Sequence, residues 1–322
     1  MMDLGLSPSQ LDLIAATRRA ATTLFPVDTT MEAITAGKPS DIDGESWRRA
    51  AELGWFSISL GAGLSLVDAA LVSIELGRAL VPGPLIGTLL AAELSRAAGH
   101  LDLALLFESG RARSGIMVDL YAVGVAGEDY AIGVRDDGAD LYELTAVEPV
   151  HGIDEATPIA RVRRRRTVAS VTDGRFHARL LVLLASYLVG LAERATEMST
   201  AYASVREQFG KPIGSFQAVK HRCAEMTIRA HTARAQVLMA ALLVESDGTE
   251  GGALESASGY LLAMQAAERN ADDNVQNHGG VGVVAECPAG AVVKRAQTYV
   301  RLGPDRRSLS SMLLDARPTQ IV

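Results

Sequence analysis

The sequence is poor in cysteine and in aromatic residues. Its 322 residues include two cysteines, Cys223 and Cys287, and aromatic side chains make up 5% of the chain. Two cysteines cannot form a disulfide framework or a four-thiolate metal site, so we expect no metal. We expect Cys223, on an apolar helical stripe, to be a buried small hydrophobe. With few aromatic rings, Leu, Ala and Val must fill the interior, which favours helix-on-helix packing.

The sequence also lacks an excess of basic residues and long uncharged apolar runs. The formal net charge is −7, which argues against general nucleic-acid binding. An anionic ligand would need a local basic site. No apolar run reaches the roughly 18 residues of a membrane span without a charge, and the N-terminus has no secretory pattern. We therefore expect a cytoplasmic protein that binds neither nucleic acid nor membrane.

Helical patterns fill the first third of the chain. Ser7 and Pro8 are typical of a helix start, and Asp43 can cap a second helix that Gly54 ends. The predicted helices lie over about 7–24, 43–53, 67–80 and 86–98. We therefore predict an N-terminal helical domain over residues 1–104.

A small β region follows. Short β-type runs occur at 115–118, 121–125, 130–134 and 141–144, with a last strand through 160–162. Turn signals such as Asp136-Asp137-Gly138 separate them. The basic run Arg163–Arg166 is typical of a solvated edge that protects a strand from pairing; contact with an anionic ligand is the alternative. We predict a reduced β domain over residues 105–176.

Long amphipathic helices return after residue 177. Apolar residues recur every three or four positions from Val219 to Val244, as expected for a helix in a bundle. The predicted helices lie over 181–202, 216–244, 253–277, 289–299 and 305–316, with a loop at 247–252. The sequence therefore predicts a mainly α fold with a small β insert and a C-terminal bundle over 177–322.

The segment Tyr202–Gln217 is the most informative part of the chain. It reads YASVREQFGKPIGSFQ and joins two helical patterns through loop-forming glycines. Arg206 can form paired hydrogen bonds with a pyrophosphate, and Phe209 or Phe216 can cover a ring. The plainer alternative is a helix hairpin with a solvated arginine.

A second segment, Asp273–Gly282, ends a helix at a glycine pair. Gly279 and Gly280 allow the backbone to approach a ligand closely. Taken alone, His278 is more typical of a packed histidine than of a ligand-binding one. The plainer alternative is a simple helix C-cap.

The two segments resemble the acyl-CoA dehydrogenase family. In that family the first binds the pyrophosphate of a flavin held mostly by a neighbouring subunit, and the second contacts the adenylate part. The resemblance implies an N-terminal helical domain, a β domain, a C-terminal four-helix bundle and FAD as cofactor. It assigns cofactor contacts to Arg206, Gln208, Phe209, Gln217, Gln276, Asn277, His278, Gly279 and Gly280.

The catalytic base of the family is missing from this chain. The family reaction is α,β-dehydrogenation of an acyl-CoA thioester, in which a carboxylate removes the α-proton. By resemblance over residues 296–302, the base falls at Gly303. The other family position, near Ala178 and Arg179, has no carboxylate either. The β region also lacks the segments that hold the isoalloxazine ring in the same subunit, so we assign no catalytic residue.

This chain keeps the residues that reach into a partner's site and lacks those that build its own site. In this it resembles the short subunit of actinobacterial α2β2 acyl-CoA dehydrogenases of steroid and cholesterol catabolism. This implies a longer partner chain that carries the base, FAD shared at the subunit interface, and a steroid-derived acyl-CoA held mainly by the partner. Two alternatives stay open. One is a self-sufficient homotetramer with a base relocated to Asp305, and the other is a non-catalytic interaction protein of the same fold.

Overall fold

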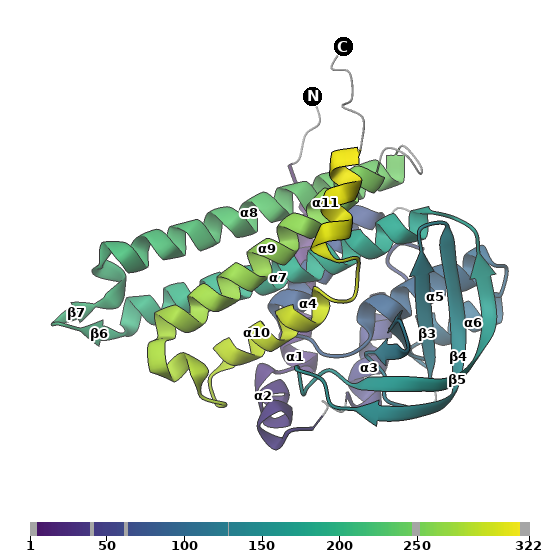
Figure 1. Ribbon diagram of the computed structural model, residues 1–322, viewed down its shortest axis with the longest axis horizontal. Coiled ribbons are helices and arrows are strands. Elements are labelled where there is room, and N and C mark those ends of the chain that lie inside the picture. The colour runs from purple at the N-terminus through teal and green to yellow at the C-terminus, as the bar shows by residue number, and fades with distance from the viewer. Residues whose placement is uncertain (1–4, 39–41, 61–63, 128, 247–251, 316–322) are drawn as a thin grey trace, which may run out of the picture.

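A computed structural model describes residues 5–38, 42–60, 64–127, 129–246 and 252–315. The protein is mainly helical and has one small β barrel (Figure 1). Three long helices run side by side away from the barrel. The N-terminal helices pack against one of these long helices and against the barrel. The predicted fold class, mainly α with a small β insert, is confirmed. Residues 247–251 of the predicted loop, and Ala316 at the end of the last predicted helix, lie outside the described residues.

Side-chain caps mark the starts of two N-terminal helices that the sequence predicted. The Ser7 hydroxyl accepts from the Gln10 backbone while the Gln10 side chain accepts from the Ser7 backbone, and Asp43 caps its helix in a similar way. The helices that begin at Val27 and Leu101 have no side-chain cap and were not predicted, whereas the helix that begins at Leu85 was predicted although it also lacks one. The helices are α1 (Pro8–Leu24), α2 (Val27–Ala36), α3 (Gly44–Glu52), α4 (Leu66–Arg78), α5 (Leu85–Ala97) and α6 (Leu101–Glu108). The predicted domain boundary at residue 104 thus falls within α6.

Five strands form a closed barrel in the order β1-β2-β5-β4-β3. The strands are β1 (Ser114–Val118), β2 (Tyr121–Val123), β3 (Tyr130–Arg135), β4 (Gly138–Val150) and β5 (Ile159–Val171). Strands β1 and β3 pair in parallel, and the other pairs are antiparallel. Small and medium apolar side chains such as Ala122, Ala131 and Leu144 fill the interior. Such small side chains suit this barrel, because a barrel of only five strands encloses little space.

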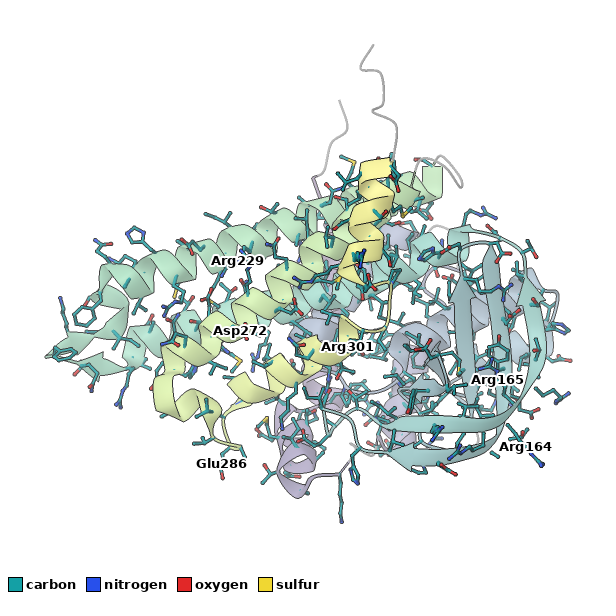
Figure 2. All side chains as sticks on the ribbon, in the orientation of Figure 1. Arg164, Arg165, Arg229, Asp272, Glu286 and Arg301 are labelled. Carbon is teal, nitrogen blue, oxygen red and sulfur yellow. The ribbon has the colours of Figure 1, made fainter. Side chains whose placement is uncertain are left out.

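Strand β5 is much longer than the sequence predicted, because it continues through the basic run. Antiparallel pairing with β4 holds this part, and Arg163 forms an ion pair with Glu148 at 2.7 Å. All four arginines are exposed, and Arg164 lies on the outer side of the barrel (Figure 2). Strand β2 covers β5 only as far as Arg161. Within the described chain, the basic part of β5 is therefore exposed, as expected for a solvated edge, whereas Ala169 further along the strand is buried.

The C-terminal half is a bundle built on a central helix. Its helices are α7 (Arg175–Val205), α8 (Gln217–Ser246), α9 (Ala253–His278), α10 (Pro288–Tyr299) and the short α11 (Arg306–Asp315). Helix α7 is long and apolar enough to cross a membrane by composition, but most of its apolar stretch is buried within the protein. It touches α4 closely at Gly190, where a Cβ would lie 2.0 Å from the Ile74 carbonyl oxygen.

A buried asparagine joins the three long helices. Asn270 on α9 donates to the Met226 carbonyl on α8 at 2.8 Å and to the Ala192 carbonyl on α7 at 3.3 Å. Its oxygen accepts from Arg229 Nε at 2.8 Å. Because each amide atom has a partner, the polar group costs little to bury and fixes the register of the helices.

A buried ion pair joins the bundle, the barrel and the N-terminal helices. Arg295 on α10 pairs with Asp154 in the β4–β5 loop, and the two side chains are 1% and 0% exposed. Arg295 also donates to the Leu80 carbonyl at 3.0 Å and to the Tyr187 hydroxyl at 2.8 Å. Leu80 has a φ of 56°, a backbone conformation that favours glycine. The guanidinium thus holds the α4–α5 loop in a strained shape.

Candidate functional site

The turn between α7 and α8 is a short β hairpin. Strands β6 (Glu207–Gln208) and β7 (Lys211–Pro212) pair antiparallel around Phe209 and Gly210. Both turn residues have positive φ, 53° and 75°, as a type I′ turn requires. A non-glycine residue in this region costs about 1–3 kcal/mol. The sequence predicted a turn but not a hairpin, since Phe-Gly is not a usual type I′ pair.

The aromatic side chain at the hairpin tip points into solvent. Phe209 is 91% exposed and meets Phe216 edge-on, with ring centroids 6.0 Å apart. The Lys211 ammonium lies 4.5 Å from the centroid of the Phe216 ring. A strained, exposed aromatic residue such as Phe209 is typical of a binding surface rather than of a packed turn.

Arg206 has a fixed backbone and a free side chain. Its N–H donates to the Tyr202 carbonyl at 2.9 Å, and its carbonyl accepts from the Ile213 N–H at 2.8 Å. The side chain is exposed, and within the described ranges no carboxylate pairs with its guanidinium. The guanidinium is therefore free to hold an anion.

Ring stacking brings the second segment beside the first. Tyr202 and His278 stack with centroids 4.2 Å apart and planes 22° apart. His278 Nδ1 lies 2.8 Å from the Asn274 carbonyl, so this nitrogen carries the proton and Nε2 is left as an acceptor. At Gly279 and Gly280 a Cβ would meet nothing within 4 Å. The backbone there is open to a ligand.

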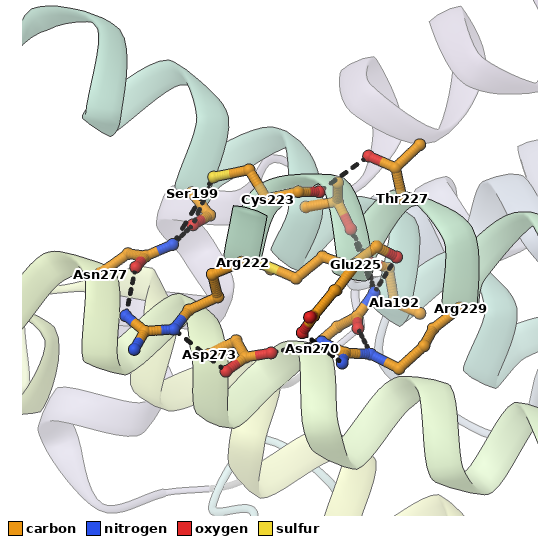
Figure 3. Close-up of polar contacts among 12 residues, drawn as sticks. Ala192, Ser199, Arg222, Cys223, Glu225, Thr227, Arg229, Asn270, Asp273 and Asn277 are labelled. Carbon is orange, nitrogen blue, oxygen red and sulfur yellow. Dashed lines mark hydrogen bonds and ion pairs between the residues drawn. The ribbon is translucent and has the colours of Figure 1, made fainter. Parts of the chain in front are cut away.

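Asn277, next to His278 in the sequence, forms hydrogen bonds with two neighbouring helices (Figure 3). It is buried, donates to Ser199 Oγ at 2.6 Å and accepts from Arg222 Nη1 at 2.7 Å. Its side chain thus ties the end of α9 to α7 and α8. The half-buried Cys223 contacts the same amide at 3.6 Å. The expectation that Cys223 is a buried hydrophobe is wrong, because α8 leaves the apolar core near this turn.

The other predicted residues lie at the same end of the bundle. Gln208, Gln217 and Gln276 are exposed, and Gln208 Nε2 donates to the Glu207 carbonyl at 2.7 Å. Figure 1 shows β6 and β7 at the end of the molecule remote from the barrel. The sequence-predicted site residues other than the buried Asn277 are therefore exposed or half-buried at this end of the bundle, and together we call them the distal surface.

The position expected for the family base is filled by a tyrosine ring. A Cβ on Gly303 would lie 2.8 Å from Tyr260 Cε1. Tyr260 is fully buried and donates to the Tyr299 carbonyl at 3.1 Å, and its oxygen accepts from the Gly303 N–H at 3.3 Å. Burial raises the pKa of the Tyr260 hydroxyl. No acidic side chain fits at residue 303 while Tyr260 keeps its place.

The other two positions offer no free base. Arg179 forms two hydrogen bonds with the buried Glu93, at 2.7 and 2.8 Å. Asp305 is exposed and caps α11 by accepting from the Ser308 N–H at 2.8 Å. That backbone hydrogen bond lowers the pKa of the Asp305 carboxyl, which makes it a weaker proton acceptor.

The contact of the barrel with the α4–α5 loop and the start of α5 is close-packed near this position. A Cβ on Gly87 would lie 2.2 Å from the Ser114 carbonyl oxygen, and one on Gly124 would lie 2.9 Å from Pro84 Cβ. The cavity left between these glycines and Leu302 measures about 10 Å³. Since a water needs about 10–15 Å³, no planar ring enters this gap.

Similar proteins agree on one family. The family model "Acyl-CoA dehydrogenase, C-terminal domain" matches residues 176–303. Acyl-CoA dehydrogenase IpdE2 of Mycobacterium tuberculosis is 34% identical over 245 residues, 75% of each chain. Acyl-CoA dehydrogenase FadE34 of the same species is 34% identical over 287 residues, which are 79% of this chain and 40% of FadE34.

Solved structures agree on the fold. The ChsE4-ChsE5 complex from Mycobacterium tuberculosis matches with a TM-score of 0.77 and 21% identity, covering 98% of this chain and 100% of that one. The "Tcur3481-Tcur3483 steroid ACAD G363A variant" matches with a TM-score of 0.79 and 20% identity, covering 95% and 97%. The chain therefore belongs to the acyl-CoA dehydrogenase family of oxidoreductases and has the fold of that family.

Proposed function

We propose that this chain is one subunit of a hetero-oligomeric, FAD-dependent acyl-CoA dehydrogenase. It contacts the flavin of a longer partner chain, and the partner carries the catalytic base. The observation that carries the proposal is a separation of the two halves of the site. The predicted cofactor contacts gather on the exposed distal surface, whereas the position of the base is packed against Tyr260.

The distal surface suits the pyrophosphate and adenylate parts of FAD. The planar guanidinium of Arg206 has no competing carboxylate among the described residues and matches two phosphate oxygens. His278 Nε2 is left as an acceptor, and the backbone at Gly279 and Gly280 is open. In this assembly Asn277 positions the segment rather than touching the cofactor, because its amide is already engaged. When bound, FAD supplies the hydride acceptor.

Exposed apolar side chains near the distal surface support a protein partner. Val205 and Val283 are 76% and 74% exposed, and Phe209 is more exposed still. Burying such side chains yields about 25 cal/mol for each Å² removed from water. Large exposed apolar groups beside a cofactor contact are typical of an interface.

The similar proteins support a second dehydrogenase chain as that partner. Two of the matching structures bear paired names, ChsE4-ChsE5 and Tcur3481-Tcur3483, and the latter is called a steroid ACAD. This chain covers 40% of FadE34, which leaves room in that relative for another unit of similar size. We propose an α2β2 assembly acting on a steroid-derived acyl-CoA held mainly by the partner.

The two alternatives receive less support. A homotetramer with a relocated base would depend on Asp305, yet that carboxylate is exposed and caps a helix. An interaction protein without a cofactor would leave the exposed Arg206 and the open backbone at Gly279 and Gly280 unexplained.

The test is flavin retention in a complex purified after co-expression with a longer dehydrogenase chain. We expect a yellow complex. We expect Arg206→Ala to weaken FAD binding roughly ten- to hundred-fold, since a charge-assisted hydrogen bond contributes about 1.5–3 kcal/mol. The control is Arg164→Ala, which removes another exposed arginine, on the barrel. Unchanged flavin content and activity with Arg206→Ala would overturn the proposal.

A further inference from the structure

Two arginines on α8 reach across to one carboxylate on α9. Arg222 lies in the second turn of α8, and Arg229 lies two turns further along the helix. Both pair with Asp273, Arg222 through Nε at 3.5 Å and Arg229 through Nη2. Figure 3 shows the two guanidinium groups on either side of this carboxylate. Since the two arginines share Asp273, their other partners distinguish them.

The other partner of Arg229 belongs to the centre of the bundle. Arg229 Nε donates to Asn270 Oδ1 at 2.8 Å. Asn270 is fully buried where the three long helices meet. Without this donor a buried amide oxygen would lose its partner, which destabilises a fold. Arg229 therefore contributes to the stability of the bundle.

The other partner of Arg222 lies directly beside the distal surface. Arg222 Nη1 donates to Asn277 Oδ1 at 2.7 Å, and Asn277 comes immediately before His278 at the end of α9. The same amide donates through Nδ2 to Ser199 Oγ on α7 at 2.6 Å. Arg222 thus fixes the end of α9 against the two helices that the β6–β7 hairpin joins.

This contact joins two parts of the distal surface that belong to different elements. The α7–α8 turn places Arg206, whereas the end of α9 places the glycine pair Gly279–Gly280. A hydrogen bond from a guanidinium to an amide oxygen is directional, and its charged donor makes it strong. The bond from Arg222 to Asn277 therefore constrains how far the glycine pair lies from Arg206.

We propose that Arg222 is a positioning residue for the cofactor. It holds the glycine pair Gly279–Gly280 at the separation from Arg206 that one FAD molecule spans, without contacting FAD itself. Its Nε and Nη1 already face Asp273 and Asn277 on α9. The role of Arg222 rests on the proposed function, because it requires that Arg206 and the glycine pair hold the same cofactor.

The experiment compares Arg222→Met with Arg229→Met in the complex purified after co-expression with a longer dehydrogenase chain. Methionine keeps a long, helix-compatible side chain and removes the guanidinium. FAD is titrated into the complex after its flavin has been removed, and flavin fluorescence reports the affinity. The urea midpoint at one protein concentration reports the stability.

We expect the two variants to rank in opposite orders in these two measurements. Arg222→Met should weaken FAD binding about ten-fold, the size of effect that a residue without ligand contact can have. Arg229→Met should lower the urea midpoint more and weaken FAD binding less than about two-fold. The absorption spectrum of the flavin that remains bound should keep its shape in Arg222→Met, because the isoalloxazine ring lies in the partner.

A second variant covers the case in which Arg222→Met does not assemble. Arg222→Lys keeps a cation beside Asp273, yet one ammonium does not reproduce the fixed geometry that reaches Asp273 and Asn277 together. We expect it to weaken FAD binding as well. FAD affinity as high as in the native complex with Arg222→Lys or Arg222→Met would show that Arg222 does not position the cofactor.

The Arg206→Ala variant separates a failure of this role from a failure of the proposed function. If Arg206→Ala weakens FAD binding and neither Arg222 variant does, the subunit role stands and the positioning role is wrong. If Arg206→Ala also leaves FAD binding unchanged, the proposed function is wrong. Equal losses of FAD affinity in Arg222→Met and Arg229→Met would contradict the positioning role, because they indicate a general loosening of the bundle. A shifted flavin spectrum would contradict it too.

Discussion

Two glycine-to-alanine changes should have opposite effects on stability. At Gly303 an added Cβ would lie 2.8, 3.0 and 3.1 Å from three atoms of the Tyr260 ring and hydroxyl. At Gly290, inside α10, the same methyl group would meet nothing within 4 Å. The pair therefore compares one chemical change in a filled site and in open space.

The structure sets the expected magnitudes. Overpacking a buried site costs about 1–3 kcal/mol. Moving Tyr260 also weakens its hydrogen bonds to Tyr299 and Gly303, each worth about 0.5–1.5 kcal/mol. We expect Gly303→Ala to lower the free energy of unfolding by about 2–4 kcal/mol. Gly290→Ala should raise it by about 0.5–1 kcal/mol, the gain of alanine over glycine in a helix.

The assay is urea unfolding followed by circular dichroism at one protein concentration, with midpoints compared at equal slope. Gly303→Glu should be destabilised at least as much as Gly303→Ala and should gain no dehydrogenase activity. If Gly303→Ala proved as stable as Gly290→Ala, Tyr260 would not fill the position of the base. The reasoning about the lost site would then be wrong.

Two further predictions concern buried charges. Asp154→Asn should lower the free energy of unfolding by about 3–5 kcal/mol, because it leaves the buried Arg295 without its anion; a loss below about 1 kcal/mol in urea unfolding would contradict this. Burial lowers the pKa of His177, with Asp136 opposing the shift, so the unfolded chain takes up the proton first as the pH falls through about 6.5. Stability should decline over that range in the native protein and decline less in His177→Gln, as urea midpoints between about pH 5 and 8 will report.

Local signals allowed much of the fold to be predicted. Ser7 and Asp43 accept the backbone hydrogen bonds that mark helix starts, and Gly279 ends α9 with a positive φ. Helices α2 and α6 lack such caps, and packing against neighbours stabilises them instead. The length of β5 was missed because its arginines are held by β4, a partner distant in sequence. A local sequence pattern does not reveal pairing between strands that are distant in sequence.

The sequence predicted which residues form the candidate site, but not which of them are exposed to a ligand and which position the others. The motif order placed Arg206 and His278 together, and the Tyr202–His278 stack shows how they meet. Asn277 is buried and positions the distal surface, whereas the predicted residues around it are more exposed. The sequence showed that residue 303 carries no acid, while the Tyr260 ring that fills its place lies more than forty positions away along the chain.

The most direct test of the central claim is the flavin-to-chain ratio of the native complex, measured by absorbance and by mass. We expect this chain, isolated with a longer dehydrogenase chain, to give one flavin for every two chains. A pure homomer of this chain that carries one flavin in each copy would contradict it.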